Sequence, residues 1–354
     1  MFSGLILAIL LTTLLLFSYF YDFLFRKSDE IFDFKFINST NDAKIILFYT
    51  QLFGDSYFKD LKNQNFQLCP KNCRLTNNLA AFEKSSAVIF HARDTKFLPS
   101  KFSREQKFVF HTAESPEMSY VRLKNLPPKI FDFTMTYRSD SDIFCPYGGF
   151  KMTENFYSGD SPKNKGLLVW LVSNCFTTSR REFYVEKLSQ FIKIDIFGRC
   201  GHRDRKFDDA EISNYKFYLS LENAQCTDYV TEKFFRRLQL PVVPIVLQRK
   251  VYQRLLPSNL KDKFVFIALD DFESPQFLAE YLRKLDKNDY LYNRYFEWRR
   301  KFTVEAATNV LPASCLCDLC QKLYSRPKIE SKIDIDAWWY NKSDCQSDYA
   351  MKLM

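Results

Sequence analysis

One stretch of the chain gathers side chains that can bind a phosphorylated ligand. Residues 215–233 read YKFYLSLENAQCTDYVTEK: an apolar run, a polar loop with Glu222 and Asn223, and then the start of a predicted helix. Asp228 or Thr231 can cap that helix with a side-chain oxygen. The free amides of the first turn would then face an anion.

Two charged side chains, Glu232 and Lys233, fall in the first turn of this predicted helix. A cation there opposes the helix dipole, so its position favours a bound diphosphate. The carboxylate can accept hydrogen bonds from the hydroxyls of a ribose or another sugar. An ordinary capped helix with a solvated Glu–Lys pair fits the same spacing, so both interpretations stay open on these residues alone.

The first half of the chain places another carboxylate after an apolar run. Residues 108–111 predict a strand, and Glu114 follows it shortly before Pro116. A carboxylate in such a place can take the proton of an attacking hydroxyl. As a bare residue, Glu114 is more typical of a helix N-terminus. His111 either orients a ligand or packs at the strand end, and we favour packing.

Apolar runs and helical patterns alternate along both halves of the chain. The predicted strands span residues 44–49, 87–91, 108–111, 167–173, 192–197, 217–221 and 242–247. The clearest predicted helices span residues 181–191 and 231–240. This alternation predicts an α/β fold of two Rossmann-like domains that face each other across a cleft, with the ligand at the carboxyl ends of the strands.

The N-terminus predicts a membrane anchor. Residues 2–21 carry no charge, and a helix of that length crosses a bilayer core of about 30 Å. A cleaved signal peptide is the alternative, but the run is long and no small-residue cleavage pattern closes it. Arg26 and Lys27 follow the span, which by the positive-inside rule would place the large domain in the cytoplasm.

Five segments follow from these patterns. We expect an N-terminal tip with a transmembrane signal-anchor, a short stem, an N-terminal Rossmann-like domain, a C-terminal Rossmann-like domain and a tail. Their predicted bounds are residues 1–25, 26–42, 43–160, 161–330 and 331–354, respectively.

Composition bounds the possible partners. Hydrophobic residues make up 46% of the 354 residues and charged residues 26%, which excludes a disordered chain and fits two domains. The net charge of +9 suits a nucleic acid, an anionic membrane or a phosphorylated small molecule. A basic surface that serves solubility is the simpler alternative.

The ten cysteines form an even set that fits disulfides in an oxidising lumen. Cys315, Cys317 and Cys320 form a zinc site if a fourth ligand comes from elsewhere, but we favour a local cluster of disulfides. The pairing does not follow from sequence. Asn38 and Asn341 begin Asn-x-Ser/Thr tripeptides and become glycosylation acceptors if the domain is lumenal.

These motifs together resemble the α1,3-fucosyltransferase family. FYLSLENA, DYVTEK and VVPIVL match its donor-binding signature in order and spacing. The chain departs from the family at residues 238–241, where the family usually has a small or glycine-containing turn. The other matching blocks lie within residues 73–300 and include AVIFHARD, KFVFHTAESP, FDFTMTYRSDSDIFCPYG, LVWLVSNC and IDIFGRCG.

The resemblance implies a GT-B type transferase that moves L-fucose from GDP-fucose, with inversion, in α1,3 linkage onto a GlcNAc-type residue. A fixed Lys and Arg would stabilise the charge that develops on the departing GDP. Arg180 is the alternative to Arg181 for this contact. The implied donor-binding residues are Arg181, Asn223, Tyr229, Glu232 and Lys233. The resemblance also implies that residues 43–160 form the acceptor domain, that residues 161–330 form the GDP-fucose-binding donor domain, and that the N-terminal tip is cytoplasmic.

The same resemblance makes Glu114 the general base for the acceptor hydroxyl. The site that the resemblance implies requires no cofactor. Whether Mn²⁺ or Mg²⁺ stimulates the transfer stays open. Asp140 and Asp142 resemble the Asp-x-Asp metal motif of another glycosyltransferase architecture, but in this block we expect them to shape the crossing between the domains.

The implied partners are GDP-fucose, a glycan acceptor on a glycoprotein or glycolipid, and a membrane through residues 2–21, with no nucleic acid. The implied location is the Golgi membrane, as a single-pass type II protein with a lumenal catalytic domain. The acceptor glycan and the oligomeric state stay undecided. The alternative function is a catalytically inactive, membrane-tethered glycan-binding homologue of the same fold.

Overall fold

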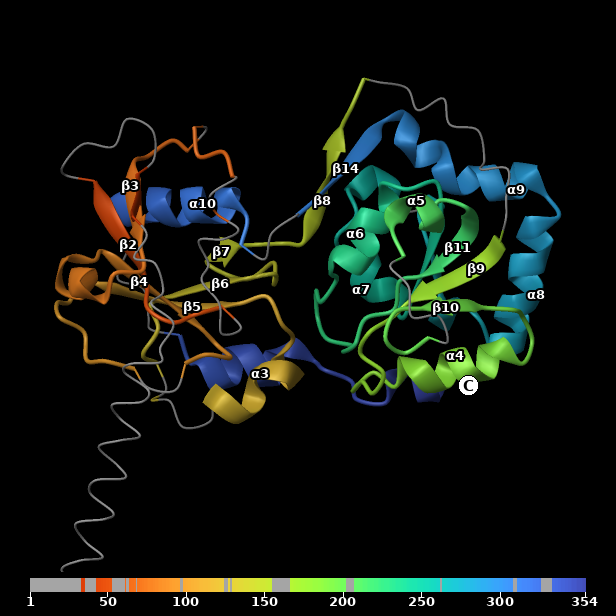
Figure 1. Cartoon of the computed structure of the whole chain (residues 1–354), viewed down its shortest axis with the longest axis horizontal. Coiled ribbons are helices and arrows are strands. Elements are labelled where there is room, and N and C mark those ends of the chain that lie inside the picture. Colours follow the sequence, from red (N-terminus) through yellow and green to blue (C-terminus); the bar gives the residue numbers. More distant parts are fainter. Residues whose placement is uncertain are drawn as a thin grey trace, which may run out of the picture.

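The chain folds into two sheet-centred units joined by several crossings (Figure 1). The predicted span at residues 2–21 and the sequon at Asn38 lie outside the described residues. Among the residues that are described, no helix is long and apolar enough to cross a membrane. The computed structural model describes residues 33–35, 43–52, 61, 64–67, 69–95, 98–123, 127, 129–154, 166–201, 207–261, 263–307, 311–325 and 333–354.

The first unit is built on a seven-stranded sheet in which every neighbouring pair is parallel except β1 with β3. Its apolar runs are buried on both faces, as in sheets covered by helices on either side. In spatial order the strands are β1 (Asp33–Lys35), β3 (Cys73–Thr76), β2 (Lys44–Phe48), β4 (Ala87–His91), β5 (Lys107–Thr112), β6 (Phe133–Thr136) and β7 (Ile143–Phe144).

The second unit holds a five-stranded, fully parallel sheet with the strand order of a doubly wound fold. In spatial order its strands are β10 (Asp195–Phe197), β9 (Gly166–Leu171), β11 (Tyr215–Leu219), β12 (Val243–Val246) and β13 (Ile267–Ala268). Its helices include α4 (Arg181–Ser189), α5 (Asp209–Ile212), α6 (Glu232–Leu238), α7 (Arg249–Gln253), α8 (Pro275–Asp286) and α9 (Asp289–Asn293).

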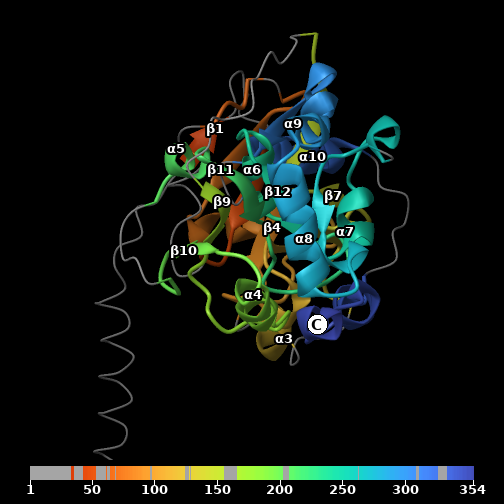
Figure 2. The same cartoon turned by 90° about the vertical axis from the view of Figure 1, so that its right-hand side faces the viewer.

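Alternating side chains of the second sheet form separate cores on its two faces. Val243 and Ile245 of β12 pack on the face covered by α4 and α8, whereas Val246 packs on the other face with α6 and α7. Figure 2 views this unit from its outer side, with α4 and α8 in front. The two periods of the sequence, 2 in the strands and 3.6 in the helices, account for this layering.

The predicted elements match the structure closely, except that one strand begins later in the structure than predicted. Each predicted strand and helix has an observed counterpart. The strand predicted at residues 192–197 begins at Asp195, because Phe191 and Ile192 donate backbone hydrogen bonds back to Leu188 and close the end of α4. Short strands such as β6 and β13 escaped prediction because two to four residues carry little periodicity.

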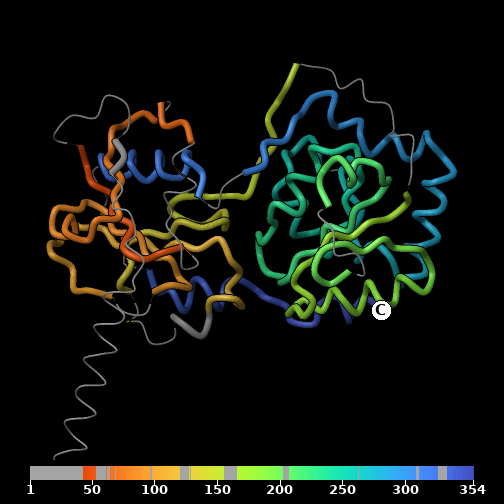
Figure 3. The backbone as a smooth tube through the Cα atoms, viewed as in Figure 1, coloured from red at the N-terminus to blue at the C-terminus, as the bar shows by residue number. Residues whose placement is uncertain are grey.

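The chain returns to the first unit near its C-terminus, and this differs from the predicted domain bounds. Strand β8 (Gly148–Met152) pairs antiparallel with β14 (Phe302–Ala306), and α10 (Ala313–Tyr324) then packs on the first sheet. Figure 3 shows the blue tube of α10 among the orange strands. Assigning all of residues 161–330 to the donor domain was therefore wrong for α10, because its apolar side chains are buried against β2 and β7.

The predicted tail also belongs to both units. Residues 333–354, the C-terminal segment, bury Ile335 and Trp339 on the face of the first sheet opposite α10. Farther along, Tyr349 and Ala350 enter the core of the second unit beside α4. Residues that follow the second unit in sequence thus cover both faces of the first sheet. Helix α10 lies on one face, and part of the C-terminal segment lies on the other.

All ten cysteines form disulfides, and their partners are distant in sequence. The expected local cluster at Cys315, Cys317 and Cys320 was wrong, because three bridges instead tie α10 to the first unit. Successive cysteines on one helix point in different directions, so each reaches a separate strand or loop. The five bridges are Cys69–Cys317, Cys73–Cys320, Cys145–Cys315, Cys175–Cys200 and Cys226–Cys345.

Candidate functional site

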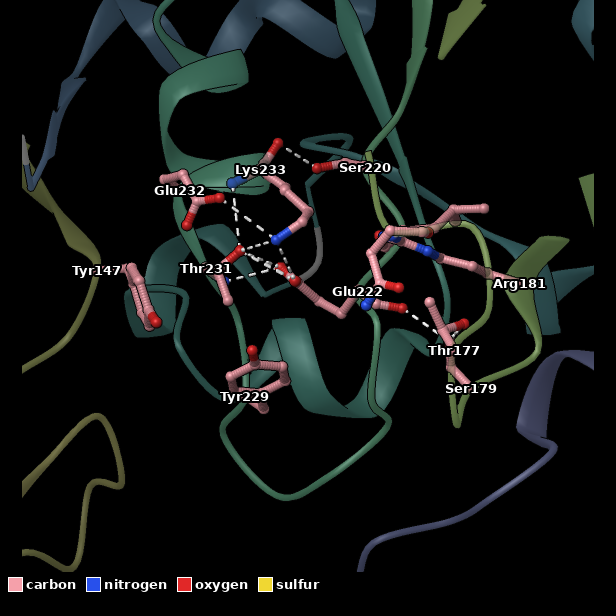
Figure 4. A network of polar contacts seen from close by, with 12 residues as sticks. Tyr147, Thr177, Ser179, Arg181, Ser220, Glu222, Tyr229, Thr231, Glu232 and Lys233 are labelled. Carbon is pink, nitrogen blue, oxygen red and sulfur yellow. Dashed lines mark hydrogen bonds and ion pairs between the residues drawn. The ribbon is translucent and has the colours of Figure 1, made fainter. Parts of the chain in front are cut away.

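The polar loop after β11 is built around the carboxylate of Glu222. This side chain is 1% exposed and accepts hydrogen bonds from the backbone and hydroxyl of Thr231, at 2.8 and 2.9 Å. Thr231 is the N-cap of α6 and accepts from the backbone of Lys233, as one of the two predicted caps. The loop and the helix start are therefore held as one rigid piece (Figure 4).

Lys233 lies between two carboxylates in this piece. Its Nζ is 3.3 Å from Glu222 and 3.3 Å from Glu232. Burial alone would lower the pKa of Lys233, but the two carboxylates raise it, so the ammonium keeps its charge. Burial would raise the pKa of Glu232, and the neighbouring Lys233 lowers it. Burial raises the pKa of Glu222 despite Lys233.

Arg181 approaches the same loop from α4. Its guanidinium donates to the carbonyls of Leu221 and Asn174 and lies 5.6 Å from the ring of Trp170. Arg180 instead points outward, where its Nε is 3.0 Å from Asp348. The structure therefore places Arg181, not Arg180, beside Glu222.

Three buried polar atoms at this loop have no hydrogen-bond partner among the described residues. They are Nε of Arg181, Oδ1 of Asn223 and Oδ1 of Asp228, of which the last lies 3.6 Å from Nε of Arg254. Buried polar groups in folded proteins are nearly always paired, with protein or with another molecule. A donor or acceptor without a partner beside two cations fits a polar, anionic ligand.

The first unit brings Glu114 to this site. Glu114 follows β5, and Tyr229 of the donor-like motif directs its hydroxyl at Glu114 Oε2 across 3.4 Å. Tyr147 joins them from the segment before β8, because its hydroxyl donates to the carbonyl of Ala113. Burial raises the pKa of both tyrosines well above the usual range, and the Glu114 charge adds to this, so they stay protonated donors.

Tyr147 was not predicted from the sequence, and Glu222 was predicted only as part of a polar loop, with no role at the site. Tyr147 belongs to the sequence CPYG, at the end of the block that also holds Asp142. An aromatic hydroxyl directly before Gly148 and Gly149, which begin β8, was the available signal. Glu222 was visible as an acidic residue directly after a strand.

The remaining predicted residues, His111, Asp140 and Asp142, bind other parts of the protein. His111 is 1% exposed, and its Nδ1 is 2.8 Å from the Met135 carbonyl, so it packs at the strand end as favoured. Asp140 binds Arg138 at 2.7 Å, whereas Asp142 accepts from Thr134 at 2.8 Å. The two carboxylates thus serve different partners.

Sequon Asn341 lies in the C-terminal segment and is exposed. Ser343 of the same tripeptide is buried and accepts a hydrogen bond from Arg138 at 2.8 Å. The exposed side chain leaves room for a glycan on Asn341 in the folded protein.

A separate hollow of about 520 Å³ lies along the edge of the second sheet at β13. None of the candidate residues lines it, so it is distinct from the site described above. Within the described ranges, no group of three or more metal-ligating side chains comes together. Residues lining the hollow include Arg249, Lys261, Lys263, Phe264, Tyr281 and Tyr295.

Known proteins share this combination of fold and motifs. Residues 41–148 match the model "Fucosyltransferase, N-terminal", and residues 161–338 match "Glycosyltransferase family 10 (fucosyltransferase) C-term". Alpha-(1,3)-fucosyltransferase C of Drosophila melanogaster is 32% identical over 360 residues, 88% of this chain and 81% of the fly protein. The 4-galactosyl-N-acetylglucosaminide 3-alpha-L-fucosyltransferase 9 of Mus musculus is 32% identical over 305 residues, 84% and 82% of the two chains.

A solved structure shares the fold. The crystal structure of an α1,3-fucosyltransferase with GDP-fucose aligns with a TM-score of 0.52 at 17% identity, and the match covers 82% of this chain and 94% of that one. The two family models together span most of the sequence; one covers strands β2 to β7 of the first sheet and the other covers the second sheet. The chain therefore belongs to glycosyltransferase family 10, the fucosyltransferases.

Proposed function

We propose that this enzyme transfers L-fucose from GDP-fucose, in α1,3 linkage and with inversion, to a GlcNAc-type residue of a glycoprotein or glycolipid. In this proposal the two units are Rossmann-like domains of a GT-B transferase that bind donor and acceptor across a cleft. One observation carries it: Glu114 of the first unit lies 3.4 Å from the hydroxyl of Tyr229, and Tyr229 belongs to the loop in which Glu222 pairs with Lys233 at 3.3 Å.

The donor would occupy the loop after β11. Lys233 and Arg181 supply two cations for a diphosphate, and the unpartnered Oδ1 of Asn223 and Nε of Arg181 would bind polar groups of the nucleotide or sugar. Glu232, at the start of α6, would accept sugar hydroxyls. Because both cations are held by protein contacts before any ligand binds, little reorganisation accompanies binding.

Glu114 would act as the general base. It would take the proton of the acceptor hydroxyl while that oxygen bonds to C1 of fucose and the bond from C1 to the diphosphate breaks. GDP leaves with added negative charge, which Lys233 and Arg181 would stabilise more in the transition state than in the ground state. A single displacement of this kind inverts the configuration at C1.

The proposal places the enzyme in the Golgi membrane as a type II protein anchored through residues 2–21. The disulfides fit an oxidising lumen, and the relatives at 32% identity are α1,3-fucosyltransferases by name. No step of the proposed reaction needs a metal. Activity in EDTA compared with Mn²⁺ or Mg²⁺ tests that point.

The test is a donor and acceptor matrix with the full-length protein in detergent. GDP-fucose, GDP-mannose and a UDP-sugar are each offered with core GlcNAc, lactosamine and lactose acceptors, and the product linkage is read by NMR. We expect transfer from GDP-fucose alone, with an α1,3 product. Transfer from another donor would contradict the proposal, and tight GDP-fucose binding without any product would favour the inactive glycan-binding homologue.

A further inference from the structure

The C-terminal segment, residues 333–354, spans both units along one side of the molecule (Figures 1 and 3). Its first part is anchored in the first unit by Trp339, which is fully buried. The Trp339 ring centroid lies 5.5 Å from that of Phe110 and 5.6 Å from that of Tyr137. Its indole N–H donates to Ser119 at 2.9 Å. This end of the segment is therefore part of the first core.

Its last part is anchored in the second unit. Tyr349 is 7% exposed and Ala350 is fully buried, and both belong to the core beneath α4. The segment thus has two fixed ends, one in each unit. Residues 340–348, between these two ends, must therefore move whenever the relative position of the two units changes.

Between these anchors the segment binds the loop that carries Asn223 and Tyr229. Thr227 donates its backbone N–H to the Ser343 carbonyl at 2.8 Å, and Gln346 donates to the Gln225 carbonyl at 2.7 Å. A disulfide joins Cys226 to Cys345 between these two hydrogen bonds. The loop is therefore tied covalently to the segment three residues before Tyr229.

The same segment binds the loop that leads into Arg181. Asp348 donates to the Thr178 carbonyl at 2.8 Å, and Ala350 donates to the Ser179 carbonyl at 3.0 Å. Ser179 in turn donates its backbone N–H to the Asn223 carbonyl at 3.2 Å. The two donor loops and the segment form one hydrogen-bonded layer.

The layer also reaches the helix that follows Glu114. Glu117, in the first turn of α3 (Pro116–Leu123), accepts hydrogen bonds from Thr178 and, at 2.8 Å, from Ser347. Arg138 of the first unit donates to Ser343 at 2.8 Å. The segment is therefore placed between the proposed base and the proposed donor site.

We propose that the C-terminal segment is a positioning element of the transfer reaction, and that Cys345 is its central positioning residue. Through Cys226 and the backbone bonds to residues 178, 179 and 225, it holds the donor loops at a fixed distance from Glu114. The inference rests on the proposed function. Its physical basis is that a loop ordered beforehand costs less conformational entropy when the donor binds.

The test compares two disulfide-deficient variants of the full-length protein. Cys226→Ser/Cys345→Ser should raise the KM for GDP-fucose and the Kd for GDP at least about fivefold, because the donor loop must then be ordered on binding. The control, Cys69→Ser/Cys317→Ser, removes a bridge of the first unit and should lower the unfolding temperature while leaving both constants within about twofold. Circular dichroism confirms that each variant is folded.

An unchanged KM and Kd in folded Cys226→Ser/Cys345→Ser would overturn the inference. Equal losses in both variants would overturn it as well, because they would show a general loss of stability. Failure of the wild-type protein to bind GDP would instead contradict the proposed function. The two failures are therefore distinguishable.

A measurement on the wild-type protein covers the case in which the variant does not fold. Hydrogen exchange is followed in peptides covering residues 341–350 with and without GDP. We expect GDP to slow exchange at Gln346 and Asp348, although the segment carries none of the proposed donor contacts, because their amides bond to the donor loops. Protection of residues 222–231 without any change in residues 341–350 would contradict the inference.

Discussion

At the residue scale, the site depends on a buried carboxylate that binds both a helix cap and a cation. Glu222 accepts two hydrogen bonds from Thr231 and pairs with Lys233 at 3.3 Å. Burying a charge is unfavourable unless its partners compensate for lost hydration. The arrangement keeps Lys233 charged and fixed before the donor arrives.

Replacing Glu222 tests this arrangement through stability. Glu222→Gln should lower the free energy of unfolding by about 2–3 kcal/mol, because Lys233 loses a partner inside the protein. The control is Glu305→Gln, whose pair with Lys151 has both side chains more than two-thirds exposed, at 69% and 68%. That change should cost under about 0.5 kcal/mol in urea unfolding. Equal costs would show that the Glu222 pair is no stronger than a surface pair.

His111 gives a prediction about pH. Burial, with a contribution from His91, lowers the pKa of His111 to about 3. Below pH 6.5, His111 binds a proton in the unfolded chain but stays neutral in the folded protein. The free energy of unfolding therefore falls as the pH falls. Between pH 6.5 and pH 5 this group should cost about 2 kcal/mol. His111→Gln should flatten the pH dependence of urea unfolding in this window, and an unchanged slope would contradict the assignment.

Some site residues could be predicted from the sequence and others could not. The cap at Thr231 and the charges at Glu232 and Lys233 follow from local spacing, because capping and helix turns are short-range. The contact between Tyr229 and Glu114 spans 115 positions and depends on how the units dock. Tyr147 was missed for the same reason, since its role follows from a neighbour in space.

At the element scale, α10 shows where local pattern fails. No helix was predicted at residues 313–324, and their local pattern does not show which sheet they cover. Because α10 follows the second unit in sequence, continuity assigned it there. Its buried face packs on β2 and β7 of the first sheet, and three disulfides hold it there. Connectivity among ten cysteines cannot be deduced from spacing.

The long-range bridge Cys73–Cys320 gives an element-scale prediction. It closes a loop of 247 residues between β3 and α10. Because Cys69–Cys317 still joins the same two regions, the Cys73→Ser/Cys320→Ser variant should lose only about 2 kcal/mol of unfolding free energy. Donor binding by calorimetry should stay unchanged, since α10 packs on the first sheet and the proposed donor residues belong to the second unit. A loss of donor affinity in a folded variant would contradict the separation of α10 from the site.

At the scale of the whole molecule, the alternating pattern predicted two α/β units, each with its own sheet. It did not predict that the chain would return to the first unit. The last residues cover the first sheet and then cross back to α4, so the chain joins the two units at more than one place. No local sequence pattern indicates that distant residues will return to the first sheet.

Net charge gives a prediction for the intact protein. The chain carries +9 at neutral pH, and the proposed donor is an anion. Raising NaCl from about 50 to about 500 mM should raise the KM for GDP-fucose several-fold, because salt screens this attraction. The KM for an uncharged acceptor should change little, which serves as the control. A donor KM independent of salt would show that the net charge plays no part in donor binding.

The central claim is that the first unit supplies the base and the second unit binds the donor. Calorimetry with GDP-fucose and initial rates of transfer are measured side by side for Glu114→Gln and Lys233→Ala. We predict that Glu114→Gln keeps the wild-type Kd within about threefold while transfer falls at least about 100-fold. Lys233→Ala should weaken binding itself at least about tenfold. Wild-type transfer by Glu114→Gln, or wild-type binding by Lys233→Ala, would contradict the account.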